Sequence, residues 1–151
     1  MSMTDVCNPE ELPAKYSVRL KLRNADTDQF QHVNNAAIAT LFEEARMAVF
    51  MQEALVHTME GKHVVVAHLA IDFIAEVLYP GEIDIGTTPV RTGNTSFELA
   101  QALYANGKLC ARASATCVLM DSKSGRPAPL PDVFRERLAL PEPLACADES
   151  R

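Results

Sequence analysis

One short stretch of the chain, residues 24–46, gathers the side chains best suited to chemistry. It reads NADTDQFQHVNNAAIATLFEEAR, with two acids, a histidine and an asparagine pair directly before an apolar pattern of helical spacing. Asparagine is favoured at a helix start, where the first backbone N–H groups lack partners and attract negative charge. A loop that folds back between Asp28 and Asn35 would place a carboxylate opposite such an anion site.

Length and charge restrict the class of protein. The chain has 151 residues, 48% of them hydrophobic, and a net charge of −6, which suits one globular domain and gives no general attraction to nucleic acid or anionic membranes. The first residues have neither the basic region nor the apolar core of a signal peptide, and no apolar run approaches the roughly 18 residues of a membrane span. We therefore expect a cytoplasmic protein without nucleic-acid or membrane partners.

The cysteines do not suggest a metal or redox centre. Cys7, Cys110, Cys117 and Cys146 form neither a CxxC motif nor a cluster with histidine. Disulfides are rare in the cytosol, so we expect reduced thiols.

The elements around residues 24–46 follow from hydrophobic spacing. Residues 15–22 alternate between apolar and polar, which predicts a half-buried strand. From Ala36 the spacing becomes helical, which predicts a helix of about 18 to 20 residues ending before Gly61, with Arg46 outside its apolar face. Residues 63–79 and 82–85 have strand patterns, and the segment 132–138 suggests a short terminal helix.

The clearest turn joins two longer strands. Residues 95–105 and 108–120 are strand-like and meet at Asn106-Gly107, the strongest hairpin signal in the chain. Small residues among the inward positions would let the long helix lie close against the sheet. The expected inward positions are Leu99, Leu103, Leu109, Ala111, Ala113 and Ala115.

These elements predict an α+β domain in which one face of an antiparallel sheet packs on one helix. We expect an N-terminal extension over 1–14, the domain over 15–140 and a disordered tail over 141–151. One helix leaves sheet edges and apolar surface uncovered, so a homodimer or a dimer of dimers is expected.

Several stretches, in order, resemble the hotdog-fold acyl-CoA thioesterases of the 4-hydroxybenzoyl-CoA thioesterase group. Residues 26–46 are similar to the family's opening motif, D-x-D-x-x-G-H-V-N-N followed by a helix carrying E-x-x-R. Later stretches resemble the family's strand segments: residues 69–73, 80–82, 93–97, 107–121 and 125–127. The resemblance covers about residues 15–131. It implies a sheet wrapped around one long helix and hydrolysis of an acyl-CoA to acid and coenzyme A, without metal or prosthetic group.

The resemblance also implies roles for the residues before the helix. Thioester hydrolysis needs a carboxylate that attacks the carbonyl or activates water, and donors for the developing oxyanion. Asp28 would be that nucleophile or general base, and the backbone N–H of Asn35 would polarise the carbonyl. His32 would orient the loop or titrate near neutral pH, Asn34 would cap the helix or brace the loop, and Asp26 would stabilise the loop through an Asx turn.

Substrate contacts are expected at the helix start and further along the chain. The candidates are Asn34, Ile38, Phe42, Ser96 and Arg91, with Met47 at the far end of the pocket. Lys123 and Arg126 join Arg91 as weak candidates for the phosphates of coenzyme A. Glu43 and Arg46 have the spacing of a structural ion pair on one helix.

Two positions depart from the family pattern, and two other functions stay open. Gln31 replaces the usual glycine, so a positive φ there would be strained. Ile38 stands where many relatives carry tyrosine. A hotdog enoyl-CoA hydratase would form a 3-hydroxyacyl-CoA without releasing thiol, and a non-catalytic acyl-CoA-binding domain would bind without turnover.

Overall fold

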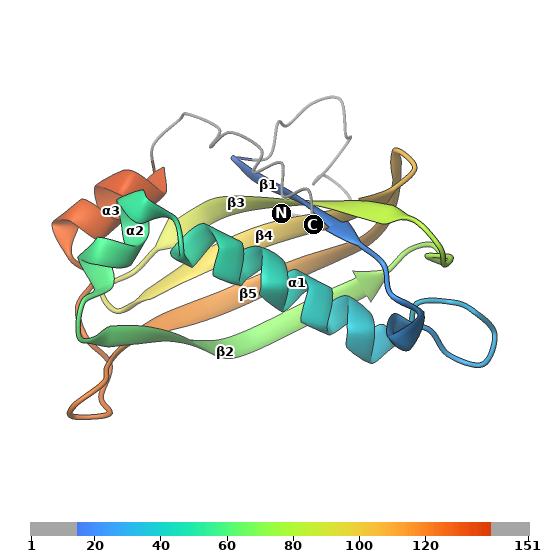
Figure 1. The fold of residues 1–151 in the computed structure, drawn as a ribbon. Helices are drawn as coiled ribbons and strands as arrows, with labels where there is room; N and C mark the ends of the chain where they lie inside the picture. The colour runs from blue at the N-terminus through green and yellow to red at the C-terminus, as the bar shows by residue number, and fades with distance from the viewer. Residues whose placement is uncertain (1–14, 140–151) are drawn as a thin grey trace.

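The computed structural model describes residues 15–139, so the expectations for 1–14 and 141–151 lie outside the described residues. Five antiparallel strands form one sheet in the order β1-β3-β4-β5-β2. Their bounds are Tyr16–Lys21 (β1), Lys62–Phe73 (β2), Glu82–Thr92 (β3), Ser96–Ala105 (β4) and Lys108–Asp121 (β5). Helix α1 (Asn35–Phe50) crosses one face of the sheet, and α2 (Glu53–Val56) and α3 (Asp132–Ala139) lie near its C-terminal end (Figure 1). The predicted α+β hotdog architecture is confirmed.

Helix α1 begins where the asparagine pair predicts and ends earlier than expected. The side chain of Asn34 accepts a hydrogen bond from the Ala37 N–H at 2.7 Å and caps the helix, as predicted. The helix has 16 residues, not 18 to 20, because Gln52 takes an extended conformation with ψ of 140°. The chain then returns to helical structure in α2 and the 3₁₀ turn η3 (His57–Met59).

Arg46 lies on the buried face of α1, so its predicted position outside the apolar face is wrong. It is 2% exposed, and its Nη1 donates to the Gln101 side-chain oxygen at 3.0 Å rather than pairing with Glu43. Gln101 in turn donates to the Phe42 carbonyl at 3.1 Å and to the Thr87 hydroxyl at 3.0 Å. Burial lowers the pKa of the Arg46 guanidinium. A buried polar network therefore joins α1 to the two central strands β3 and β4.

The β4–β5 hairpin confirms the predicted turn and corrects one inward position. Asn106 and Gly107 have φ of 52° and 74°, the left-handed pair that this tight turn requires. Ala111, Ala113 and Ala115 are buried as expected, the first two in one cluster with the apolar face of α1. Leu109 is half-buried, because the register shifts between Leu103 and Tyr104.

Cys110 and Cys117 are buried free thiols, as predicted, whereas Cys7 and Cys146 lie outside the described residues. Burial raises the pKa of Cys117 to about 11, although the nearby Arg46 guanidinium opposes the shift. Because the thiolate is the reactive form, we expect Cys117 in the folded protein to resist iodoacetamide at pH 8 and to react after denaturation. Peptide mass mapping measures this, and modification of native Cys117 at the rate of a free thiol would contradict it.

Strand β2 forms an edge of the sheet and exposes apolar side chains. Val65, Val66, Leu69 and Phe73 are 37–48% exposed. Such an edge also carries backbone groups that no neighbouring strand satisfies. Within residues 15–139, no helix is long and apolar enough to cross a membrane.

Candidate active site

The loop between β1 and α1 is closed at its base by backbone hydrogen bonds. Asn34 N–H donates to the Asp26 carbonyl at 2.9 Å, and Val33 N–H donates to the Val77 carbonyl at 2.8 Å. Thr27 and Val33 form a single antiparallel bridge. The loop therefore folds back on itself directly before the helix, as the sequence predicts.

Asp26 braces the entry to this loop. It is 4% exposed and ends the 3₁₀ turn η2 (Asn24–Asp26). Its carboxylate accepts from Arg23 N–H at 2.8 Å and from Arg23 Nη2 at 2.9 Å, so the bond runs back along the chain rather than forward as in an Asx turn. Burial alone would raise the pKa of Asp26, but the hydrogen bonds and charge of Arg23 hold it below its ordinary value.

Asp28 is held in place by the backbone of its own loop. Its Oδ1 accepts from Phe30 N–H at 2.8 Å and from His32 N–H at 3.3 Å. Its own N–H donates to the His32 carbonyl at 2.9 Å. Both N–H groups bind Oδ1, so among the described residues Oδ2 has no hydrogen-bond partner. One oxygen is thus an anchor, and the other is available to a substrate or a water molecule.

Gln31, which stands where the family pattern has glycine, adopts a left-handed conformation. Its φ is 63°, which costs a non-glycine residue roughly 1–2 kcal/mol. We expect Gln31→Gly to raise the free energy of unfolding by about 0.5–1 kcal/mol, because the relief of strain exceeds the added freedom of the unfolded chain. Urea unfolding measures the change.

The neighbouring Gln29 supplies the control, since it is exposed in the same loop and its φ is not positive. Gln29→Gly should leave stability unchanged or lower it by a few tenths of a kcal/mol. Equal effects at the two positions would show that the left-handed conformation of Gln31 carries no strain.

The first turn of α1 offers N–H donors next to this loop. Asn34 caps only the Ala37 N–H, and the Ile38 N–H bonds to the Asn34 carbonyl. Helix geometry therefore leaves the N–H groups of Asn35 and Ala36 without an intrahelical acceptor. Together with the helix dipole they favour an anion at this point.

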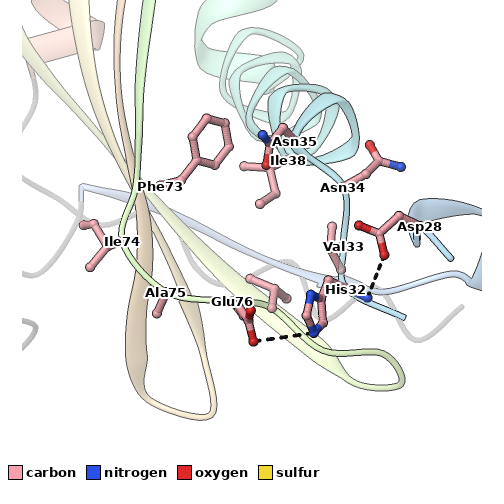
Figure 2. A pocket seen from close by; sticks show the side chains of 11 residues that line it. Asp28, His32, Val33, Asn34, Asn35, Ile38, Phe73, Ile74, Ala75 and Glu76 are labelled. Atoms are coloured by element: carbon pink, nitrogen blue, oxygen red, sulfur yellow. Dashed lines mark hydrogen bonds and ion pairs between the residues drawn. The ribbon is translucent and has the colours of Figure 1, made fainter. Parts of the chain in front are cut away.

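A pocket of about 520 Å³ brings most of these residues together. Figure 2 shows Asp28, His32 and Asn34 from the loop around it, with Asn35 and Ile38 from α1. Five of the eight predicted site residues thus line one pocket. The remaining wall is the segment 73–77 at the end of β2, which the sequence pattern predicts only as strand. Glu76 in that segment is a charged pocket residue that was not predicted from the sequence.

Three predicted substrate contacts lie elsewhere in this chain. Phe42 is completely buried in the core. Ser96 pairs with Val118 of β5, whereas Phe73, which lines the pocket, pairs with Ala111 of the same strand. Seven residues separate these two positions in β5, which corresponds to roughly 23 Å along the strand. Arg91 lies at the same end of the sheet and pairs with Glu98 at 3.5 Å. Within one chain, these three do not belong to the pocket around Asp28.

Lys123 and Arg126 belong to the turn after β5, at the far end of the sheet from the pocket, because Asp121 pairs with Lys62 at the start of β2. Met47 is 40% exposed on α1. Among residues 15–139, no group of three His, Cys, Asp or Glu side chains is arranged to hold a metal ion.

The sequence and the fold were compared with known proteins. The model of the thioesterase-like superfamily matches residues 22–138. Comparison with curated proteins gives no significant match. Many solved structures share the fold.

Three of the similar structures carry thioesterase names. A thioesterase from Thermus thermophilus, in complex with coenzyme A and Zn, is 34% identical, with a TM-score of 0.73 over 83% of this chain and 92% of that one. A predicted thioesterase from Bacillus stearothermophilus is 26% identical, with a TM-score of 0.74 over 82% and 92%. A probable thioesterase from Escherichia coli is 25% identical, with a TM-score of 0.73 over 81% and 95%.

The family match spans most of the described chain, and the resemblance inferred from the opening motif is confirmed. The predicted enzyme class, thioester hydrolase, is confirmed with it. The chain belongs to the thioesterase-like superfamily.

Proposed function

We propose that the protein hydrolyses an acyl-CoA thioester to a free acid and coenzyme A. The observation that carries the proposal is the anchored carboxylate of Asp28, whose Oδ1 is bound by two backbone N–H groups beside the open first turn of α1. The similar thioesterase from Thermus thermophilus was solved with coenzyme A, which supports a coenzyme A thioester as substrate.

In the proposed reaction, the start of α1 binds the carbonyl oxygen and the Asp28 loop provides the attacking group or base. The thioester carbonyl oxygen would sit against the N–H of Asn35, where the helix start stabilises the charge that develops on it. Asp28 Oδ2 would attack the carbonyl carbon or take a proton from the attacking water. Asn34 keeps the helix start in place through its cap, and Ile38 supplies an apolar wall for the acyl group.

Further parts of the proposal concern partners and location. We infer that two copies associate through the apolar edge strand β2, because an uncovered edge of this kind favours pairing with a second chain. A second copy could then supply the contacts expected of Ser96 and Arg91, whereas Phe42 is buried in the core of its own chain. The free thiols of Cys110 and Cys117 suit a reducing compartment, so we propose that the enzyme is cytoplasmic. We also propose that it needs no cofactor, because the reaction above assigns attack and charge stabilisation to the protein's own groups.

The direct test is release of free thiol from a panel of short, long and aromatic acyl-CoAs, followed with a thiol reagent. Turnover on at least one of them is expected, and the ranking identifies the acyl preference. Mass spectrometry of the products separates the alternatives. Formation of a 3-hydroxyacyl-CoA without free thiol would indicate a hydratase, and tight binding without turnover would indicate a binding domain; either result contradicts the proposal.

A further inference from the structure

Glu76 is a pocket carboxylate that the proposed reaction does not yet use. It lies in the connection between β2 and β3 and lines the same pocket as Asp28 and His32. Its Oε2 is 3.5 Å from His32 Nε2, and Figure 2 shows the two side chains turned toward each other. The imidazole of His32 therefore has a carboxylate on one side within the pocket.

The backbone keeps these two side chains together. Residues 31–33 run antiparallel to residues 77–79, with a bridge between His32 and Leu78. Val33 N–H donates to the Val77 carbonyl at 2.8 Å. Because Glu76 directly precedes this ladder and His32 lies within it, the backbone places the two side chains beside each other.

The contact favours a proton on one of the two ring nitrogens. An ionised carboxylate is negative and only accepts hydrogen bonds, so Glu76 at 3.5 Å from Nε2 favours the ring form that has a proton on Nε2. Nδ1 has no hydrogen-bond partner among the described residues. It can therefore accept a proton in the neutral ring and donate one in the charged ring, while Nε2 keeps its contact with Glu76.

We propose that Glu76 is a positioning residue that holds His32 so that Nδ1 delivers a proton to the departing sulfur of the substrate. This inference rests on the proposed hydrolysis of an acyl-CoA. Taking Asp28 as general base, a bond forms between the water oxygen and the carbonyl carbon, and the water proton passes to Asp28. The C–S bond breaks, its electron pair goes to sulfur, and sulfur takes the proton from Nδ1. Asp28 then loses a proton to solvent and His32 regains one from solvent, so atoms and charges balance.

A change of leaving group tests this role. A thiol that ionises at lower pH leaves faster and needs less help from a proton donor. The same acyl group is therefore supplied as its coenzyme A thioester and as its 4-nitrothiophenyl thioester. Wild type, Glu76→Gln, His32→Gln and the double variant are compared, with Glu82→Gln as a matched control at an exposed carboxylate outside the pocket.

With the coenzyme A thioester, we expect Glu76→Gln to lower kcat about tenfold with KM changed less than about twofold. This lies below the usual range for proton-transfer catalysis because a thiolate leaves easily. The double variant should be no slower than His32→Gln alone, since Glu76 acts through His32. With the 4-nitrothiophenyl thioester the loss should shrink to less than about twofold.

Equal losses on both thioesters would mean that Glu76 only supports the loop, and unchanged kcat or additive losses would also overturn the inference. Failure of the proposed function has a different signature, because the wild type would then release coenzyme A from no acyl-CoA. Matching circular dichroism and thermal unfolding of all variants exclude misfolding as the cause.

Discussion

Replacing Asp28 with asparagine is expected to lower kcat for acyl-CoA hydrolysis about 10²–10⁴-fold, the range that a general base contributes. The change removes the charge and the basic oxygen. It keeps an Oδ1 that can still accept from Phe30 N–H and His32 N–H, so the loop should retain its shape. Thiol release gives kcat, and urea unfolding should show a free energy within about 0.5 kcal/mol of wild type.

Asp84→Asn is the matched control, since the Oδ1 of Asp84 also accepts a hydrogen bond, from Arg19 Nε at 2.9 Å, but the residue lies outside the pocket. Its activity should equal that of wild type. If Asp28→Asn kept more than about a tenth of wild-type kcat, Asp28 would be neither base nor nucleophile.

A single turnover in ¹⁸O-labelled water tests whether Asp28 is the nucleophile. A nucleophilic carboxylate forms an anhydride with the acyl group, and hydrolysis of that anhydride at the carboxyl carbon of Asp28 would leave label in the residue. A general base takes only a proton and stays unlabelled. Label in the peptide that contains residue 28, measured by mass spectrometry, therefore identifies Asp28 as the nucleophile.

Gln101→Leu is expected to lower the free energy of unfolding by about 3 kcal/mol. Arg46 is 2% exposed, its Nε has no hydrogen-bond partner within residues 15–139, and Gln101 accepts from its Nη1. Leucine would leave the guanidinium buried with still fewer hydrogen-bond acceptors. Removing one partner of a buried hydrogen bond to a charged group is among the most destabilising kinds of substitution. Urea unfolding at one fixed protein concentration measures the loss.

The double variant Arg46→Met with Gln101→Leu tests the cause. Removing both polar partners should restore a large part of the lost stability, because no buried charge remains to be satisfied. Glu98→Gln, which breaks the exposed pair with Arg91, should cost less than about 1 kcal/mol. A double variant as unstable as Gln101→Leu would assign the loss to packing instead.

Sequence reasoning was most successful where the signal was local. The structure confirms three such predictions: the helix start at the asparagine pair, the hairpin at Asn106-Gly107 and the buried small residues of β5. Each of them depends on the residues themselves and on their neighbours in the chain. The pocket residues between Asp28 and Ile38 were found together for the same reason, since one loop and one helix turn hold them.

The errors arose where distant segments decide. Arg46 was placed outside the apolar face of the helix, but it is buried and donates to an acceptor 55 residues away in β4. Leu109 turned away from the core through a shift in strand register. Glu76 escaped notice because only the pairing of residues 31–33 with 77–79 brings it to His32. Of the three, only Arg46 has a periodic signal, because it follows Phe42 by four residues and so lies on the buried face of the helix.

The strand order also has a consequence for how the site assembles. Strands β3, β4 and β5 are consecutive in the chain and adjacent in the sheet, so this meander requires only short loops to close before its contacts form. Strands β1 and β2 join its two outer sides across long sequence separations, and the loop of Asp28 and helix α1 lie between them in the chain. Because slow steps in folding are those that bring distant segments together, we expect the loop that carries Asp28 to be among the last parts to reach its final geometry.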